Sequence, residues 1–259
     1  MQIVFIGAGR LATNLAPALQ RAGHNILQVY SRTMDASKTL ADRVGATAIT
    51  NLQEVSTEAD VYVFSVTDTV LPQLISQMPQ TVRNSVFLHT AGSVPMTVFE
   101  GNSFHYGVFY PMQTFSKGRE VDFETIPVFI EGNDSRSQQV VKELATSVSE
   151  NVRELSSEGR RHLHLAAVFA CNFANHCYEL SAEILAKYGV PFEVMLPLVD
   201  ETAAKVHELS PRDAQTGPAI RYDKNVLESQ KALLTDNPLH TQIYDLMSRS
   251  IHQSSLKDK

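Results

Sequence analysis

Short apolar runs alternate with amphipathic segments through the first 155 residues of the chain. The runs are rich in β-branched and aromatic residues, as is typical of buried strands, and they cover residues 2–6, 26–30, 61–66, 86–88, 104–110, 128–130 and 151–155. Apolar residues at helical spacing between them predict helices over residues 10–21, 35–44, 69–78 and 135–149. This alternation predicts an α/β fold with a doubly wound, mostly parallel sheet of Rossmann type.

The pattern changes after about residue 156. Neither Gly nor Pro occurs between Arg160 and Tyr188, where Leu, Ala and Phe dominate, so the sequence predicts one long helix there. Further helices are expected over residues 192–208, 225–234 and 241–252. The chain is therefore expected to form two domains, an α/β domain over residues 1–156 and an all-α domain over residues 157–259.

Composition and charge narrow the class of protein. The 259 residues are 43% hydrophobic and 19% charged, which is typical of a globular protein rather than a disordered one. A net charge of -6 argues against nucleic-acid and anionic-membrane partners, both of which need clustered cations. No apolar run is long enough to span a membrane, and no basic leader precedes the first apolar run. Together with two cysteines, Cys171 and Cys177, that we expect to be reduced, this predicts a soluble cytoplasmic protein.

A glycine-rich turn stands between the first strand and the first helix. It reads Gly7-Ala8-Gly9-Arg10-Leu11-Ala12, which matches the pattern G-x-G-x-x-G/A. In that pattern the first glycine makes a tight turn, the second lets the backbone approach a pyrophosphate, and the small third residue keeps helix and sheet close. The helix N-terminus attracts the phosphates. The alternative is a purely structural turn, but the position between strand and helix favours a dinucleotide site.

The end of the second strand indicates which dinucleotide is bound. Sites for NAD usually carry Asp or Glu there, whereas this chain has Ser31, Arg32 and Thr33. Two hydroxyls and a guanidinium suit a 2′-phosphate, so NADP(H) is favoured over NAD. The alternative is a solvated Arg32 with Asp35 binding the ribose, but Asp35 falls in the first turn of the next helix, where it is a good cap.

Two further strand ends are expected to meet the same ligand, because open parallel sheets bind ligands at their carboxyl edge. They contribute Val66 and Thr67 from one strand and Thr90 and Ala91 from the next. Nearby, Asp68 is interpreted as the N-cap of the following helix. His89 is interpreted as a core histidine rather than a catalytic one.

The long helix carries a polar stripe whose central members are uncharged His and Asn side chains. The stripe comprises Arg161, His164, Asn172, Asn175, His176 and Glu179. Buried His and Asn side chains need partners, so the stripe indicates a cleft wall, and the solvent edge of an amphipathic helix remains the alternative. His164 can exchange protons near neutral pH, and Asn172 can hydrogen-bond a carbonyl or imine substituent. No zinc-binding pattern is present, and no metal is expected.

Two other clusters are candidates for binding substrate. One is Tyr110 to Thr114, in which Gln113 can bind a carboxylate or amide. The other is the segment from Thr216 to Asp223, in which Arg221 suits an anionic substrate, with a structural pairing of Arg221 to Asp223 as the alternative.

The motifs taken together also resemble a known family. GAGRLATNLAPAL and YSRT resemble the NADP-binding domain of pyrroline-5-carboxylate reductase, 6-phosphogluconate dehydrogenase-like enzymes and prephenate dehydrogenase. LHTAGS, GVFYPMQTF, HLAAVFACNF and TGPAIRYD resemble the uncharacterised Rossmann-like family with a C-terminal helical domain of unassigned function. The resemblance covers nearly the whole chain and implies an NADP-dependent oxidoreductase fold that dimerises through its helical domain. The lysine that related dehydrogenases place on the long helix is missing here, which leaves His164 and Asn172 as candidates.

The sequence therefore predicts an NADP(H)-dependent oxidoreductase that acts on a small, anionic C=O or C=N compound in an interdomain cleft. In this hypothesis His164 is the acid/base, Asn172 and Gln113 orient the substrate, and Tyr110 and Arg221 contact it. The alternative hypothesis is an NADP-binding sensor or assembly protein of the same fold without turnover. A homodimer is expected in either case.

Overall fold

A computed structural model describes residues 1–116 and 118–256 of the chain. They form two compact units, Met1–Cys171 and Asn172–Lys259. Helix α5 begins at Ser157, where the sequence pattern changes, and the compact units divide further along, inside a π-helical segment. The domain boundary after residue 156 stays a prediction.

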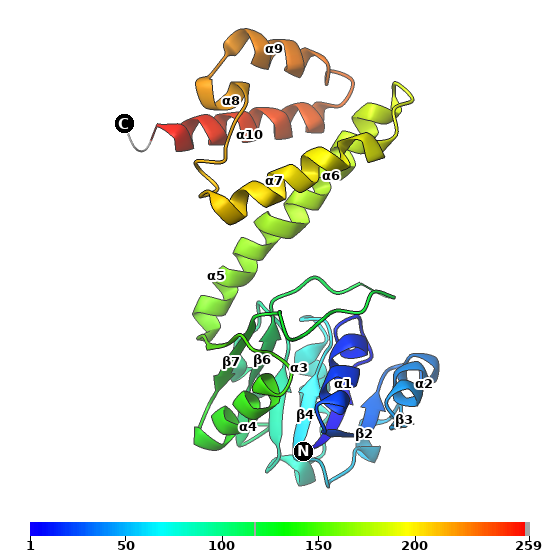
Figure 1. Ribbon diagram of the computed structural model, residues 1–259. Helices are drawn as coiled ribbons and strands as arrows, with labels where there is room; N and C mark the ends of the chain where they lie inside the picture. Colours follow the sequence, from blue (N-terminus) through cyan, green and yellow to red (C-terminus); the bar gives the residue numbers. More distant parts are fainter. Residues whose placement is uncertain (117, 257–259) are drawn as a thin grey trace. The chain divides into compact units, whose positions relative to one another are not determined.

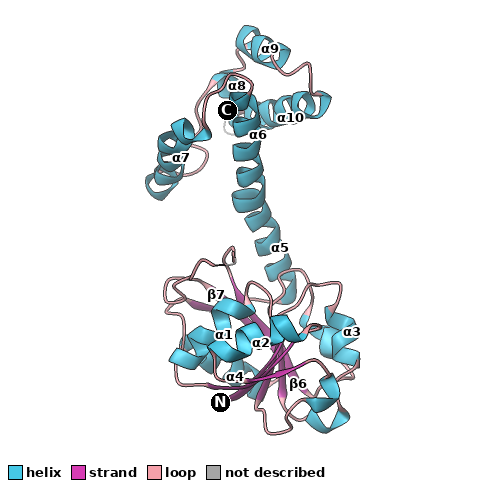
Figure 2. Ribbon diagram, turned by 90° about the vertical axis from the view of Figure 1, so that its right-hand side faces the viewer, coloured by secondary structure: helices cyan, strands magenta, loops and turns pink. Residues whose placement is uncertain are grey.

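The first unit contains an eight-stranded sheet (Figures 1 and 2). The spatial order is β3-β2-β1-β4-β5-β6-β7-β8. The strands are β1 (Gln2–Ile6), β2 (Asn25–Tyr30), β3 (Thr47–Ile49), β4 (Val61–Phe64), β5 (Val86–His89), β6 (His105–Pro111), β7 (Val128–Gly132) and β8 (Val152–Glu154). Every pair is parallel except β6 with β7. The predicted doubly wound, mostly parallel sheet is confirmed.

Helices cover both faces of this sheet, which explains why its central strands are apolar throughout. The helices of the unit are α1 (Ala12–Arg21), α2 (Met34–Arg43), α3 (Leu71–Ser76), α4 (Ser135–Thr146) and α5 (Ser157–Ala167). Ile3 and Phe5 of β1 point into one core with α1, α2 and α4. Val4 and Ile6 point into the other core with α3. Successive side chains of β1 point to opposite faces of the sheet and so belong to two separate hydrophobic cores.

Three of the helices and strands differ from the sequence prediction. Strand β3 was not expected, because three residues beside a glycine give too little pattern to be recognised. The long helix is interrupted by a π-helical segment, Val168–Phe173, which no glycine or proline marks. The short helix α8 (Pro218–Arg221) forms where we expected a loop.

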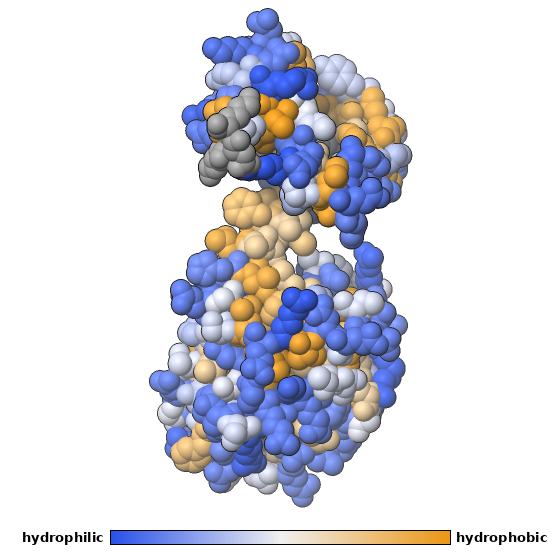
Figure 3. All heavy atoms as spheres, turned by 60° about the vertical axis from the view of Figure 1, so that its left-hand side comes forward, coloured by the Kyte–Doolittle hydropathy of each residue, from blue (hydrophilic) through white to orange (hydrophobic). Residues whose placement is uncertain are grey.

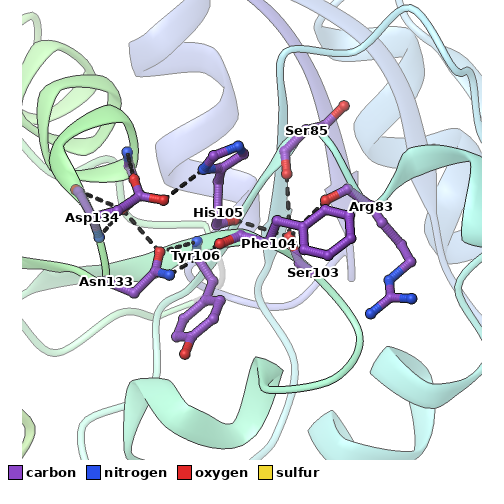
Figure 4. A network of polar contacts seen from close by, with 9 residues as sticks. Arg83, Ser85, Ser103, Phe104, His105, Tyr106, Asn133 and Asp134 are labelled. Carbon is purple, nitrogen blue, oxygen red and sulfur yellow. Dashed lines mark hydrogen bonds and ion pairs between the residues drawn. The ribbon is translucent and has the colours of Figure 1, made fainter.

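A polar network fixes the amino end of β6 (Figure 4). His105 Nδ1 and Asp134 Oδ2 lie 2.6 Å apart, and Asp134 also accepts a hydrogen bond from the Ser137 amide at 2.8 Å. Asn133 Oδ1 accepts the Tyr106 amide at 2.7 Å. Asp134 is the N-cap of α4, so the network ties that helix to β6. It stabilises the end of β6 away from Tyr110.

The second unit is entirely helical in the part that the structure describes. It contains α6 (Ala174–Ala186), α7 (Leu196–Glu208), α8, α9 (Lys224–Ala232) and α10 (Pro238–Ser255). Only Ala219, Leu227 and Leu234 are buried among its described residues. Large apolar side chains are exposed instead, and they include Leu198, Leu239, Leu246 and Met247. Figure 3 shows orange, hydrophobic atoms at the surface of this unit. None of the described helices is long and apolar enough to cross a membrane.

Candidate active site

A cavity of about 620 Å³ opens at the carboxyl ends of β1, β2, β4 and β5. Its lining comprises Gly7, Ala8, Gly9, Arg10, Leu11, Tyr30, Ser31, Arg32, Ser65, Val66, Thr67, Asp68, Val70, Leu74, Thr90, Ala91 and Gly92. This cavity is lined by all the residues that were predicted from the sequence to bind the cofactor, except Ala12 and Thr33. The chain crosses from one side of the sheet to the other between β3 and β4, so the cavity lies at the topological switch point, where open α/β sheets bind ligands.

The turn after β1 needs glycine at one position for its own geometry. Gly7 has φ +116, and a Cβ there would collide with the carbonyl oxygen of Ser65. Its amide donates to the Tyr30 carbonyl at 2.9 Å, which holds the turn against β2. Gly9 is different, because the nearest atom to a Cβ there would be Ser65 O at 3.7 Å. The bare backbone at Gly9 is therefore free for a ligand rather than required by packing.

Helix α1 presents an open N-terminus to the cavity. Its N-cap residue, Leu11, makes no side-chain capping bond, and its first turn carries no acidic residue. Ala12 is fully buried, which allows the helix to lie close to the sheet. Uncapped amides and the positive end of the helix dipole suit an anionic group, and phosphate is the commonest such ligand. The turn thus has the shape and the polarity of a phosphate cradle.

The loop after β2 adds a cation to the rim of the cavity. Arg32 is exposed, and within residues 1–116 and 118–256 its guanidinium has no ion pair or hydrogen bond. Thr33 is the N-cap of α2, with its hydroxyl accepting the Ala36 amide at 3.4 Å. The expectation that Asp35 caps this helix is therefore wrong, because the side chain at the preceding extended position is the one that can reach the amides.

Asp68 was predicted to be the N-cap of the helix that follows it, and the structure shows that it is not. Helix α3 starts at Leu71, and its N-cap residue is Val70, which makes no side-chain bond. Asp68 lies too early in the chain to cap the helix and lines the cavity instead. By contrast, the interpretation of His89 as a core histidine is confirmed, since it is 0% exposed at the end of β5.

Two side chains from distant parts of the sequence meet beside the cavity. Tyr110 Oη, at the end of β6, and His164 Nδ1, on α5, lie 3.0 Å apart and share a hydrogen bond. The His164 ring also packs on Gly92, where a Cβ would lie 2.6 Å from Nδ1. Gly92 lines the cavity, so the imidazole lies next to this part of the lining. A histidine that is hydrogen-bonded to a phenol next to a ligand cavity is an arrangement that general acid–base catalysis can use.

The environment of Tyr110 keeps its phenol neutral. Burial raises the pKa of Tyr110 above its ordinary value, the positive charge of Arg160 opposes that rise, and the carboxylate of Asp68 adds to it. A neutral phenol can accept a hydrogen bond from an imidazole N–H or donate one to a bare imidazole nitrogen.

The other residues that were predicted to contact the substrate, Gln113, Asn172 and Arg221, are exposed. Gln113 follows β6, and its Oε1 accepts the Thr114 amide at 2.8 Å. Asn172 and Arg221 belong to the second compact unit. Asp223 is the N-cap of α9, where it accepts the Val226 amide at 3.4 Å. Across residues 1–116 and 118–256, no group of three or more His, Cys, Asp or Glu side chains could hold a metal ion.

Arg160 and Glu131 also lie beside the site, and neither was predicted from the sequence. Their charged groups form a buried ion pair, with Arg160 Nη1 and Glu131 Oε2 separated by 2.7 Å. Arg160 stands four residues before His164, so the two share one face of α5. That spacing could have indicated that Arg160 lies near His164. The sequence alone did not favour a buried Arg160, however, because a charged residue in the first turn of a helix is usually solvated.

Comparisons with known proteins agree with this geometry. A model of Rossmann-like domains matches residues 1–101, and the domain of unknown function DUF2520 matches residues 126–251. No curated protein matches the chain. Among solved structures, a Bacteroides fragilis protein provisionally named an NADP oxidoreductase is 52% identical, with 97% of this chain and 98% of that chain covered and a TM-score of 0.89.

More distant structures share the fold. One is 1-pyrroline-5-carboxylate reductase from Streptococcus pyogenes, at 15% identity, with 98% of each chain covered and a TM-score of 0.66. Another is an imine reductase from Myxococcus stipitatus in complex with NADP+, at 16% identity, with coverage of 98% and 94% and a TM-score of 0.71. The chain therefore belongs to the family of Rossmann-like proteins that carry the DUF2520 domain in their C-terminal part.

Proposed function

We propose that this protein is an NADP(H)-dependent oxidoreductase that reduces, or forms by oxidation, a C=O or C=N bond in a small anionic compound. The observation that carries the proposal is the cavity at the sheet's carboxyl edge, which is lined by the glycine turn and has the Tyr110–His164 pair next to its Gly92. The 52% identical relative, provisionally named an NADP oxidoreductase, supports the same activity.

The cofactor is held mainly by backbone. Gly7 to Leu11 and the start of α1 bind the diphosphate, and Arg32 with Ser31 binds the 2′-phosphate. We assign Val66, Thr67, Thr90 and Ala91, which also line the cavity, to the nicotinamide half of the cofactor. Asp68 lines the same cavity, and its carboxylate is compatible with the positive charge of an oxidised nicotinamide.

His164 supplies the proton that the reduction requires. When bound, the cofactor supplies a hydride to the carbon of the C=O or C=N bond. Protonated His164 donates its Nδ1–H to Tyr110 Oη, which leaves Nε2–H free to protonate the oxygen or nitrogen of the substrate. The neutral phenol fixes the ring in this orientation. In the oxidative direction, His164 takes the proton back at the same nitrogen.

Substrate contacts by Gln113, Asn172 and Arg221 remain predictions. Gln113 and Asn172 orient the carbonyl or imine group, and Arg221 binds an anionic substituent through a bidentate contact. The proposed interdomain cleft also remains a prediction from the sequence. A spectrophotometric panel of keto acids, cyclic imines and hydroxy acids with NADPH or NADP+ identifies the substrate class.

Cofactor choice gives the first test. Replacing Arg32 by Ala removes the cation that binds the 2′-phosphate, so we expect NADPH affinity to fall by roughly ten- to a hundredfold. NADH affinity should change little, because NADH lacks that phosphate. Thermal-shift titrations with each nucleotide measure both effects, since a ligand raises the melting temperature only of the protein that binds it. Equal shifts with NADPH and NADH in the wild type would contradict the assignment.

The proton donor gives the second test. In His164→Gln, we expect turnover to fall at least about a hundredfold while NADPH binding is retained. Calorimetry with NADPH provides the control, because His164 is outside the phosphate cradle. Full turnover in this variant would remove His164 from the mechanism. NADPH binding by the wild type, without its consumption by any member of the panel, would instead favour a sensor or assembly role.

The helical unit supports the proposal that the protein is a homodimer. Helices α6, α7 and α10 have no buried residue within a single chain. A second copy of the chain would cover these apolar side chains, because a monomer rarely leaves so many exposed together. Light scattering on the purified protein reports the mass of the particle.

A further inference from the structure

Arg160 is an arginine with almost no solvent exposure, at 1%. A buried guanidinium is costly unless its hydrogen bonds are satisfied, and this one has partners on all sides. Its Nη1 donates to Glu131 Oε2 at 2.7 Å, and its Nε donates to the Ala91 carbonyl at 3.2 Å. Its Nη2 donates to the Val94 carbonyl and, at 3.2 Å, to Ser157 Oγ.

These bonds connect three separate segments of the chain. Glu131, on β7, accepts the Ser157 amide at 2.9 Å and the Ser157 hydroxyl at 2.6 Å. The Ser157 hydroxyl in turn accepts the Met96 amide at 3.0 Å. The first turn of α5 is therefore joined both to β7 and to the loop that follows β5. Nothing in the cofactor-binding role requires this arrangement.

The same loop forms the wall on which His164 rests. Ala91, whose carbonyl binds Arg160, and Gly92, on which the His164 ring packs, are neighbours in the cavity lining. Arg160 and His164 are separated by four residues of α5 and so project from one helix face. The guanidinium of Arg160 thus attaches one turn of α5 to the loop after β5. This contact also holds the imidazole of His164 in place, because His164 lies one turn further along the same helix.

We propose that Arg160 is a positioning residue for proton transfer, which clamps α5 to the cavity wall so that His164 keeps its bond to Tyr110. The proposal rests on the function proposed above. Glu131 completes the clamp by neutralising the buried charge, and Ser157 joins the two. Because Tyr110 comes from β6, a small rotation of α5 would break the Tyr110–His164 bond before it disturbed the fold of the sheet.

Electrostatics give Arg160 a second effect on the pair. Its positive charge lowers the pKa of Tyr110 against the rise that burial produces, while Asp68 acts in the opposite direction. Removing the charge should therefore raise the pKa of Tyr110 further. The titration of Tyr110 therefore reports whether this charge has been removed, and the hydrogen-bonding state of the His164 ring reports whether the clamp positions it.

The test uses the full-length protein with Arg160→Lys, Arg160→Met and the double variant Glu131→Leu/Arg160→Met. The double variant removes both buried charges together, and such replacements often preserve stability. Arg161→Met is the matched control, because Arg161 is an exposed arginine at the next position of the same helix. Melting temperatures identify the variants that remain folded.

Histidine nitrogen NMR is the primary readout, with the His164 signals assigned by comparison with His164→Gln. We expect the wild type and Arg161→Met to show one ring form of His164 with a hydrogen-bonded Nδ1. In the folded Arg160 variants, we expect the His164 ring to show more than one form and to lose the hydrogen bond at Nδ1. Tyrosine ring-carbon NMR should show the Tyr110 titration moved to higher pH in the variants that lack the charge, and largely kept in Arg160→Lys.

Turnover is the secondary readout, measured with the panel substrate. Misplacing His164 should lower kcat by roughly ten- to a hundredfold, with NADPH affinity within about threefold of the wild type. Unchanged His164 signals and unchanged kcat in a folded double variant would overturn the proposal. The NMR readout needs no substrate, so a wild type without turnover rejects the proposed function, while the His164 signals still decide the role of Arg160.

Discussion

Replacing Gly9 by alanine is expected to leave the fold intact and to weaken NADPH binding by roughly a hundredfold or more, a loss of about 2.8 kcal/mol. The nearest atom to the added Cβ is Ser65 O at 3.7 Å, an ordinary contact, so the free energy of unfolding should hardly change. The methyl group would instead fill the space through which the diphosphate reaches the backbone. Calorimetry with NADPH and urea unfolding measure the two quantities separately.

Gly7 provides the matched comparison, because the same substitution meets a different environment there. Alanine at residue 7 has to adopt φ +116 and collides with the Ser65 carbonyl, so we expect it to lower the free energy of unfolding by roughly 2–4 kcal/mol. Loss of stability at Gly7 and loss of affinity at Gly9 would separate the structural glycine from the ligand-binding one. Wild-type NADPH affinity in Gly9→Ala would show that no phosphate approaches this backbone.

A second large effect is expected on the dependence of stability on pH. Burial is the main cause that lowers the pKa of His89 from its ordinary 6.5 to about 3; the positive charge of Arg160 acts in the same direction, and a backbone hydrogen bond partly opposes both. Between these two values the unfolded chain binds a proton that the folded chain does not, so stability is complete above pH 6.5 and is lost as the pH falls toward 3. At about 1.4 kcal/mol per pKa unit, the loss amounts to a few kcal/mol.

The variant His89→Asn tests this assignment. Its amide oxygen can replace Nδ1 as the acceptor of the Ala91 N–H, which lies 3.2 Å from Nδ1, and it does not titrate. Urea unfolding at several pH values between 7 and 4 should therefore show a flatter profile for the variant than for the wild type. His24, whose pKa burial also lowers, contributes in the same direction to both proteins. Identical slopes for the two proteins would locate the acid sensitivity elsewhere.

Most of the sheet and the cofactor cradle could be predicted because their signals are local. A buried parallel strand needs a short β-branched run, and QIVFI supplies one directly before the glycine turn. A turn with positive φ and no room for a side chain needs glycine, as at Gly7. The place of Arg32 in the cavity lining could be predicted because the end of the second strand lies at the ligand-binding edge in this fold.

Other local signals were too weak or were ambiguous. Strand β3 offers only three residues, and its place at the sheet edge comes from pairing with β2 rather than from its own pattern. Asp35 and Asp68 are both good capping residue types, yet Thr33 caps α2 and no side chain caps α3. Capping depends on the residue at which the backbone becomes helical. In both helices, that residue differs by one or two positions from the helix start predicted from the sequence.

By itself, the sequence determined that a strand, a tight glycine turn and a helix start follow one another at the beginning of the chain, because the identities and spacing of neighbouring residues suffice for these three features. Only the tertiary structure decided that a phenol and an imidazole meet beside the cavity. Tyr110 and His164 are 54 residues apart, and the buried Arg160–Glu131 pair spans 29. Such contacts arise when α5 packs against the strand ends, and no period in the sequence encodes which partners that packing brings together.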